Sequence, residues 1–268
     1  MEPALLTSPP KSTSLYALVI QLGAASQQVI PDTLNKALHT QVMEWLSLAD
    51  IQIVDAIRSS QASPFSLSGL MGNRRQRGTQ PGDDFTFRIC LLNGDLIDPL
   101  LQGIEQWGRK PLSLEKCPFV IRSIYTLPGT HPLAEFSNYA LLAKKAQVFD
   151  DITLKFFSPT SFKQNQVIQP FPLPELVFGS LLRRWNIFAP PELHFSQIEW
   201  NAFISAFELK TSALKMENKT EIGAEGWVRY RFLDPEQSRI ATILAHFAEF
   251  AGVGRKTAMG MGQVITND

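Results

Sequence analysis

Four histidines are the side chains of this sequence best suited to move a proton near neutral pH, because the ordinary pKa of imidazole is about 6.5. His39 stands in a stretch whose apolar residues recur at helical spacing. Counting about 100° per residue, it lies roughly 90° from the centre of the apolar face. The sequence therefore predicts a histidine at the margin of a buried face, where packing fixes the ring and a ligand can reach it. A boundary histidine with only a hydrogen-bonding role is the alternative.

The other three histidines are weaker candidates for proton transfer. His131 stands between Thr130 and Pro132, and His194 follows the Pro190-Pro191 pair; we expect both in exposed loops. His246 falls within the last predicted helix and is expected to be structural. It stays a reserve candidate because a glycine-rich segment follows it closely.

Two Gly-x-Gly pairs enclose a cationic centre near the end of the chain, directly after a predicted amphipathic helix. Glycine permits positive φ and close backbone approach, so such a loop can point N–H groups at phosphate oxygens. It is not a Rossmann fingerprint, because the third glycine position holds Thr257, and no Walker loop occurs. A helix cap followed by a tight turn is the alternative. The residues predicted to bind a phosphate chain are Gly252, Gly254, Arg255, Lys256, Thr257, Gly260 and Gly262.

Further arginines could widen a phosphate-binding surface, because guanidinium groups fork onto phosphates. Arg74, Arg75 and Arg77 stand in the predicted loop 71–82, which is typical of a flexible hairpin tip; a solubilising loop is the alternative. The other candidates are Arg183 and Arg184 in a predicted helix, and Arg229 and Arg231, which alternate on a predicted strand and so point the same way.

Other chemistry finds little support in the sequence. Lys plus Arg and Asp plus Glu are 25 each, so a nucleic-acid site must come from local clusters of cations. The adjacent carboxylates at 83–84 and 150–151 are typical of turns. No His-Glu-x-x-His motif, Gly-x-Ser-x-Gly elbow or cysteine cluster occurs, and we expect no metal and no cofactor. Two cysteines in 268 residues, with no signal-peptide or membrane-spanning pattern, indicate a cytoplasmic protein.

The elements that would position these residues follow one order twice. Strands are predicted at 15–22, 64–70, 84–92 and 112–126, with helices at 34–49, opened by Pro31-Asp32, and at 96–107. The second half has strands at 151–157 (ending at Ser158-Pro159), 203–214, 226–233 and 264–266, with helices at 173–185 and 235–251. Strand, helix, strand, strand, helix, strand is the ferredoxin-like pattern. We therefore expect an α+β chain of two tandem ferredoxin-like domains, 1–147 and 148–268, the second carrying the glycine-rich loop.

The segment 252–262, Gly-Val-Gly-Arg-Lys-Thr-Ala-Met-Gly-Met-Gly, resembles the signature loop of the CRISPR repeat-processing endoribonucleases, the Cas-six family. Residues 152–162, 174–185 and 247–251 resemble a strand and two helices of that family, so the resemblance covers most of 150–266. The first half is similar mainly in element order. The resemblance implies metal-independent cleavage of precursor CRISPR RNA within each repeat. A 2′-hydroxyl would attack the adjacent phosphate and leave 2′,3′-cyclic phosphate and 5′-hydroxyl ends.

The resemblance also implies a catalytic role for His39, because several members carry their catalytic histidine in the first helix. Others place a histidine after that helix, where 53–57 here contains none. Lys36 and Arg58 are expected as cationic support, and the glycine-rich loop and the arginines above as RNA-binding residues. The expected partner is CRISPR repeat RNA, with a CRISPR effector complex and a homodimer as further candidates and no membrane.

Two other functions stay open at this point. One is a catalytically silent relative that holds repeat RNA in an effector complex, and the other is a structural protein that uses the fold for protein contacts. If the glycine-rich loop binds RNA, we expect Gly254→Val or Gly260→Val to lower RNA affinity more than fold stability.

Overall fold

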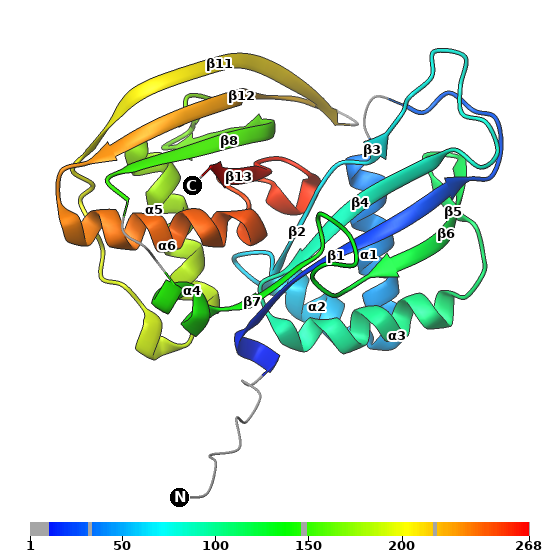
Figure 1. The fold of residues 1–268 in the computed structure, drawn as a ribbon. Helices are drawn as coiled ribbons and strands as arrows, with labels where there is room; N and C mark the ends of the chain where they lie inside the picture. The colour runs from blue at the N-terminus through cyan, green and yellow to red at the C-terminus, as the bar shows by residue number, and fades with distance from the viewer. Residues whose placement is uncertain (1–10, 32–33, 146–148, 217–218, 268) are drawn as a thin grey trace, which may run out of the picture.

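The computed structural model describes residues 11–31, 34–145, 149–216 and 219–267. In this part of the chain two antiparallel sheets lie next to each other, with helices packed against each (Figure 1). The predicted domain boundary between 147 and 148 falls outside the described residues and stays a prediction, and Asp32 also falls outside them. None of the described helices is long and apolar enough to cross a membrane.

The first sheet has the strand order β2-β4-β1-β6-β5, in which β2-β4-β1-β6 is the ferredoxin-like arrangement. β3 and β7 add to it by pairing with β4 and β1. Its strands are β1 (Ser14–Ala24), β2 (Phe65–Leu67), β3 (Met71–Gly72), β4 (Asp84–Leu91), β5 (Leu112–Leu114), β6 (Cys117–Tyr125) and β7 (Glu135–Asn138). The helices of this half are α1 (Asn35–Ala49), α2 (Ile51–Ser59), α3 (Ile97–Trp107) and α4 (Tyr139–Lys145), with short 3₁₀ turns at Lys11–Thr13 and Gly94–Leu96.

The second sheet has the order β11-β12-β8-β13, which is again ferredoxin-like. Its strands are β8 (Asp151–Thr160), β11 (Ala202–Met216), β12 (Lys219–Phe232) and β13 (Val264–Asn267), beside a small hairpin of β9 (Phe162–Gln164) and β10 (Val167–Gln169). The helices are α5 (Pro174–Phe188) and α6 (Pro235–Ala251), with 3₁₀ turns at Pro191–Leu193 and Thr257–Met259. The repeated order confirms the predicted tandem ferredoxin-like fold.

Local sequence signals explain where the last helix begins and ends. Pro235 occupies the first turn of α6, and the Asp234 side chain accepts hydrogen bonds from the next free backbone N–H groups. Gly252 ends the helix with φ of 67°. These signals are why the predicted bounds, 235–251, agree with the observed ones.

Two of the differences between the predicted and the observed elements have a local physical reason. β8 continues through Pro159 to Thr160, because the pairing register with β12 shifts between Ala224 and Gly226, so the ladder bond that proline cannot donate is not required there. The helix α2 was not predicted. It begins because Asp50 ends α1 and accepts a hydrogen bond from Gln52 N at 2.8 Å.

Two apolar cores hold the described residues together, and each draws on the other half of the chain. The core of the second half includes Leu15, Ala17 and Leu92 from the first half. The core under α1 and α3 includes Ala258 of the glycine-rich loop. The loop is therefore a packed part of the junction between the two sheets.

Candidate functional site

The C-terminal end of α6 is fixed by side chains from the first half of the chain. Ser66 Oγ donates to the carbonyl of Phe250 at 2.6 Å, and an Arg88 amine donates to that of Glu249 at 2.6 Å. Such carbonyls have no partner within their own helix. The point from which the glycine-rich loop departs is thus set by contacts across the junction.

Arg184 continues this arrangement from α5. It is buried, and its guanidinium donates to Ala251 O, to Thr257 Oγ1 at 2.6 Å and to Ser63 O at 3.2 Å. Burial lowers its pKa to about 10. The prediction that Arg184 belongs to an RNA face is therefore wrong: it joins α5, the glycine-rich loop and the first sheet. Thr257, also predicted to bind RNA, is buried in the same contact.

The glycines of the loop are required by packing against protein. The φ angles of Gly252, Gly254, Gly260 and Gly262 lie between 67° and 79°. A Cβ at Gly254 would overlap the carbonyl of Ser161, and a Cβ at Gly262 would overlap the carbonyl of Val253. The expectation that valine at Gly254 or Gly260 would lower RNA affinity more than stability stays a prediction, and the structure adds that valine would also lower fold stability, because these positions must be free of a side chain. The helix-cap alternative describes Gly252, whose N–H donates to the carbonyl of residue 248.

The glycine-rich loop docks on the first turn of α1. Asn35 Nδ2 donates to Met259 O at 2.9 Å, and a Cβ at Gly260 would overlap the Asn35 side chain. His39 follows Asn35 by four residues, so both lie on one side of the helix, with Cβ atoms roughly 5–6 Å apart. The fold thus brings His39 and the loop together.

His39 is half-buried, as its helical spacing predicts. Its ring lies 5.7 Å, centroid to centroid, from that of Phe65 on β2. Burial lowers the pKa of His39 below 6.5. A neutral imidazole at pH 7 can accept a proton, so the site offers a general base.

The two cations of the loop share one carboxylate. Glu221 on β12, whose side chain is only 9% exposed, pairs with Arg255 and, at 2.5 Å, with Lys256 Nζ. The hydrogen bond from Lys256 and the charge of Arg255 hold the pKa of Glu221 below its ordinary value. Part of the positive charge that the sequence assigned to a phosphate is therefore balanced within the protein.

The arginine-rich loop after β3 lies beside the start of α1. All three arginines are exposed. Arg74 donates to Pro31 O at 3.0 Å, just before α1, and Arg75 pairs with Asp83 at 2.9 Å. Arg77 accepts, through its backbone carbonyl, a hydrogen bond from Gln27. Side-chain contacts hold the segment in place, and the contact with Pro31 puts Arg74 near the start of α1, the helix that carries His39.

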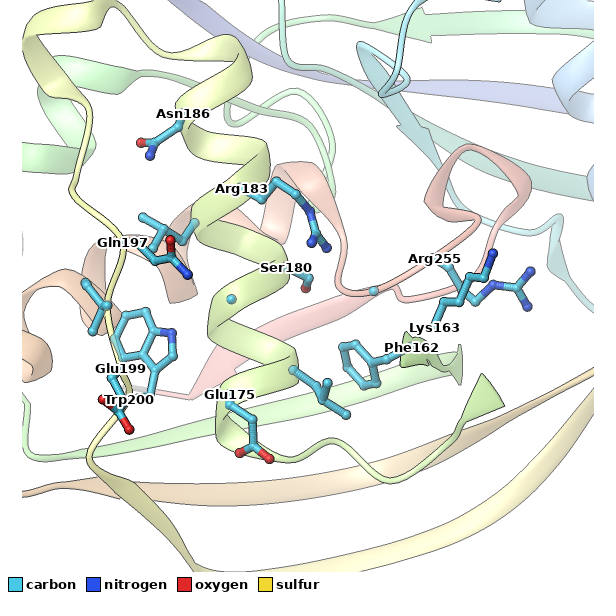
Figure 2. A pocket seen from close by; sticks show the side chains of 15 residues that line it. Phe162, Lys163, Glu175, Ser180, Arg183, Asn186, Gln197, Glu199, Trp200 and Arg255 are labelled. Carbon is cyan, nitrogen blue, oxygen red and sulfur yellow. The ribbon is translucent and has the colours of Figure 1, made fainter. Parts of the chain in front are cut away.

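A groove of about 1240 Å³ runs along α5 from the glycine-rich loop. Lys163, Arg183 and Arg255 line its end at the loop, and Figure 2 shows Arg183 extending from α5 toward the side where the other two lie. Glu175 and Glu199 line the rest of it. The structure therefore adds Lys163 to the predicted cations and places Arg183 with the loop.

Arg229 and Arg231 lie elsewhere, on the side of the second sheet opposite its helices. Both are exposed and alternate with buried Tyr230, as predicted. Arg231 makes a two-pronged ion pair with Asp151, and Arg229 Nε donates to Thr153 Oγ1 at 3.3 Å.

The remaining predicted residues have their own partners. Arg58, 68% exposed, pairs with Asp55 at 3.9 Å. Lys36 is exposed in the first turn of α1. His246 lines a small cavity behind β8, and His131 accepts a hydrogen bond from Leu133 N while its ring lies 5.2 Å from that of Tyr125.

Asn35, Glu221, Arg88 and Lys163 are the site residues that sequence reasoning missed. Asn35 and Glu221 act through partners 224 and 35 positions away, and no local pattern marks such pairs. Among the described residues, no group of three or more His, Cys, Asp or Glu side chains is arranged to hold a metal ion.

Two ferredoxin-like units, with the glycine-rich loop of the second docked on the histidine-bearing helix of the first, place the chain in the tandem ferredoxin-like fold class. The family model for CRISPR-associated endoribonuclease Cas6 matches residues 154–264. A CRISPR-associated endoribonuclease Cas6 of Mycobacterium tuberculosis is 24% identical over 268 residues, which cover 94% of this chain and 77% of that protein.

Solved structures of Cas6 proteins have the same fold. One Cas6 product complex superposes with a TM-score of 0.81 at 22% identity, and another with 0.74 at 25% identity. Each match covers 95% of this chain and 100% of the other chain. The family match, the curated relative and these solved structures together make the chain similar to Cas6 proteins over nearly its whole length.

Proposed function

We propose that this chain binds CRISPR repeat RNA and cleaves precursor CRISPR RNA within the repeat, without a metal ion. Similarity to proteins named CRISPR-associated endoribonucleases supports the reaction class. Related solved structures described as product and substrate-mimic complexes support binding of the RNA. The observation that carries the proposal is the docking of the first turn of α1, one helical turn before His39, on the glycine-rich loop.

His39 acts as the general base in this proposal. The neutral imidazole accepts the proton of a 2′-hydroxyl while that oxygen forms a bond to the adjacent phosphorus. The bond from phosphorus to the 5′-oxygen then breaks, and that oxygen takes a proton from an acid or from water. The products are a 2′,3′-cyclic phosphate and a 5′-hydroxyl, and the catalyst regains its starting state when His39 loses its proton.

Cations near α1 would stabilise the negative charge that develops on the phosphate oxygens. Lys36 lies in the first turn of α1. Arg74 donates a hydrogen bond to the carbonyl of Pro31, which stands four positions before Asn35. The rest of the RNA would follow the glycine-rich loop, where Arg255 and Lys256 stand, and the groove end beside Arg183. Arg58 is the most peripheral of the proposed supporting residues. An effector complex, a homodimer and a cytoplasmic location stay predictions from the sequence.

Cleavage of repeat RNA in the presence of EDTA tests the proposal. The RNA that co-purifies with the protein supplies the repeat sequence for the assay. We expect cleavage at one position, with a 3′ end that resists ligation until the cyclic phosphate is opened and a 5′ end that a kinase can phosphorylate directly. Binding of the co-purified repeat without cleavage, or cleavage abolished by EDTA, would contradict it.

A further inference from the structure

One side of the second sheet carries large apolar side chains together with cationic side chains on its central strands. We call this the open face and define it by Lys155 and Phe157 of β8, Trp227 and Arg229 of β12, and Ile265 of β13. Figure 1 shows β8 and β12 side by side in the middle of the sheet, with α5 and α6 on one side of it. The open face is the side opposite these helices.

The pairing register places these side chains next to one another. Lys155 is opposite both Trp227 and Ile265 in the ladders of its two neighbouring strands. Residues directly opposite in an antiparallel ladder project to the same face, so the three form a row. The alternate residues Leu154 and Val228 are buried beneath them.

The exposure of these side chains is not explained by folding. Phe157 is 51% exposed on the inner strand β8, and Ile265 is 38% exposed on the neighbouring edge strand β13. Apolar area left in water gives up about 25 cal/mol per Å² of stabilisation. Clusters of exposed apolar side chains rimmed by polar groups mark binding sites.

The cationic side chains of the open face indicate what kind of ligand it would bind. Lys155 Nζ lies 5.1 Å from the centroid of the Phe157 ring, and the exposed Arg229 stands two residues after Trp227 on the same side of β12. Arg231 is neutralised by Asp151, and Glu208 stands opposite Trp227 on the edge strand. Cations beside the exposed Phe157 ring and the partly buried Trp227 ring, on the middle strands of a ferredoxin-like sheet, suit single-stranded RNA, whose bases stack on aromatic rings while its phosphates meet the cations.

The open face is continuous with the glycine-rich loop. Phe157 N donates to Gln263 O at 2.9 Å, and Gln263 follows the last glycine of the loop. A strand of RNA that leaves the loop can therefore pass directly onto Phe157. We propose that the open face binds a single-stranded segment of the RNA outside the cleaved phosphate, with bases stacked on Phe157 and Trp227. This inference rests on the proposed function.

Binding of a fluorescein-labelled oligouridine of about ten nucleotides, measured by anisotropy, tests the inference apart from cleavage. Stacking contributes about 1–3 kcal/mol per base, so Phe157→Ala and Trp227→Ala should each weaken binding by roughly tenfold. Lys155→Ala should weaken binding and flatten its salt dependence. Single-turnover cleavage of a minimal repeat RNA at saturating protein should not change in any of them.

Phe207→Ala is the matched control. Phe207 is 56% exposed on the edge strand, and its ladder partner is the buried Val228, so it belongs to the other face. It should bind oligouridine like the wild type once thermal melting shows that it is folded. If Phe157→Ala and Trp227→Ala bind oligouridine as the wild type does, or if the wild type does not bind it, the inference is wrong and the face serves another partner. If oligouridine binds as expected but repeat RNA is not cut, the proposed function fails and the binding site stands.

Discussion

Asn35 donates a hydrogen bond from its side-chain amide to the backbone carbonyl of Met259, 224 positions later in the chain. This contact joins the first turn of α1 to the glycine-rich loop. His39 lies one helical turn further along the same side of α1. The proposed base and the loop proposed to hold the RNA are therefore linked by a contact between the two halves of the chain.

Arg184 should be a structural residue and Arg183 an RNA contact. Arg184→Ala leaves two buried oxygens and one part-buried oxygen without their charged donor, so we expect a loss of about 3 kcal/mol or more in the free energy of unfolding. Arg183→Ala, at the next position but exposed, should change stability by less than about 0.5 kcal/mol and weaken RNA binding. Urea unfolding and filter binding measure both effects. Equal stability losses in the two variants would contradict the distinction.

Gly254 should be irreplaceable for folding, because its φ is 78° and a Cβ would overlap the carbonyl of Ser161. We expect Gly254→Ala to lower the free energy of unfolding by about 2 kcal/mol or more. Gly179 is the control, since it lies within α5 and no atom comes within 4 Å of an added Cβ. Gly179→Ala should stabilise the protein by about 0.5–1 kcal/mol. Thermal melting that shows Gly254→Ala as stable as the wild type would refute the packing role of the loop.

Lys256 and Glu221 should change the salt dependence of RNA binding in opposite directions. Lys256→Ala removes a cation near the RNA, so the slope of log K against log salt should flatten by up to about one unit. Glu221→Gln removes the carboxylate that balances Arg255 and Lys256, so the slope should steepen. Titrations at several salt concentrations give both slopes. A flatter slope in Glu221→Gln would show that the ion pair is needed to hold the cations against the RNA.

The fold could be predicted from the sequence because the signals that mark its helices and strands act over short stretches of the chain. Apolar periodicity, the Asp234–Pro235 helix start and the glycine at the end of α6 each act within a few residues, and their order repeats. The sequence also placed His39 at the margin of a buried face. What it could not show was where polar side chains point across the junction. Arg183 and Arg184 look alike in sequence. In the structure Arg183 is exposed, whereas Arg184 is buried and donates to oxygens of Ala251, Thr257 and Ser63.

For the glycine-rich loop, the sequence predicted the backbone conformation but not the atoms that surround it. Its composition indicates a backbone that needs positive φ, which the structure confirms. Composition does not reveal what approaches that backbone. In the structure the close neighbours are Ser161, Asn35 and Val253, which belong to the protein itself.

The rate of cleavage should depend on pH through His39. Burial lowers the pKa of His39 below 6.5, so the imidazole stays neutral as pH falls from 7 toward that value. A base acts unprotonated, so the single-turnover rate should be flat above its pKa and fall with unit slope below it, with a midpoint under about 6.5. The unfolded chain binds this proton more readily, so the contribution of His39 to stability is present above pH 6.5 and is lost as pH falls. A midpoint clearly above 6.5 would contradict the assignment of His39 as the base.

Single-turnover cleavage by His39→Ala, with protein in excess over repeat RNA, tests the central claim most directly. Loss of a general base should slow the chemical step by about a hundredfold or more, while RNA affinity changes little. Excess protein matters because slow product release would otherwise hide the chemical step. His246→Ala, in the last helix, is the matched histidine control and should cut at the wild-type rate. Cleavage by folded, RNA-bound His39→Ala at the wild-type rate would contradict the account, and loss of cleavage in His246→Ala alone would move the base to the other side of the glycine-rich loop.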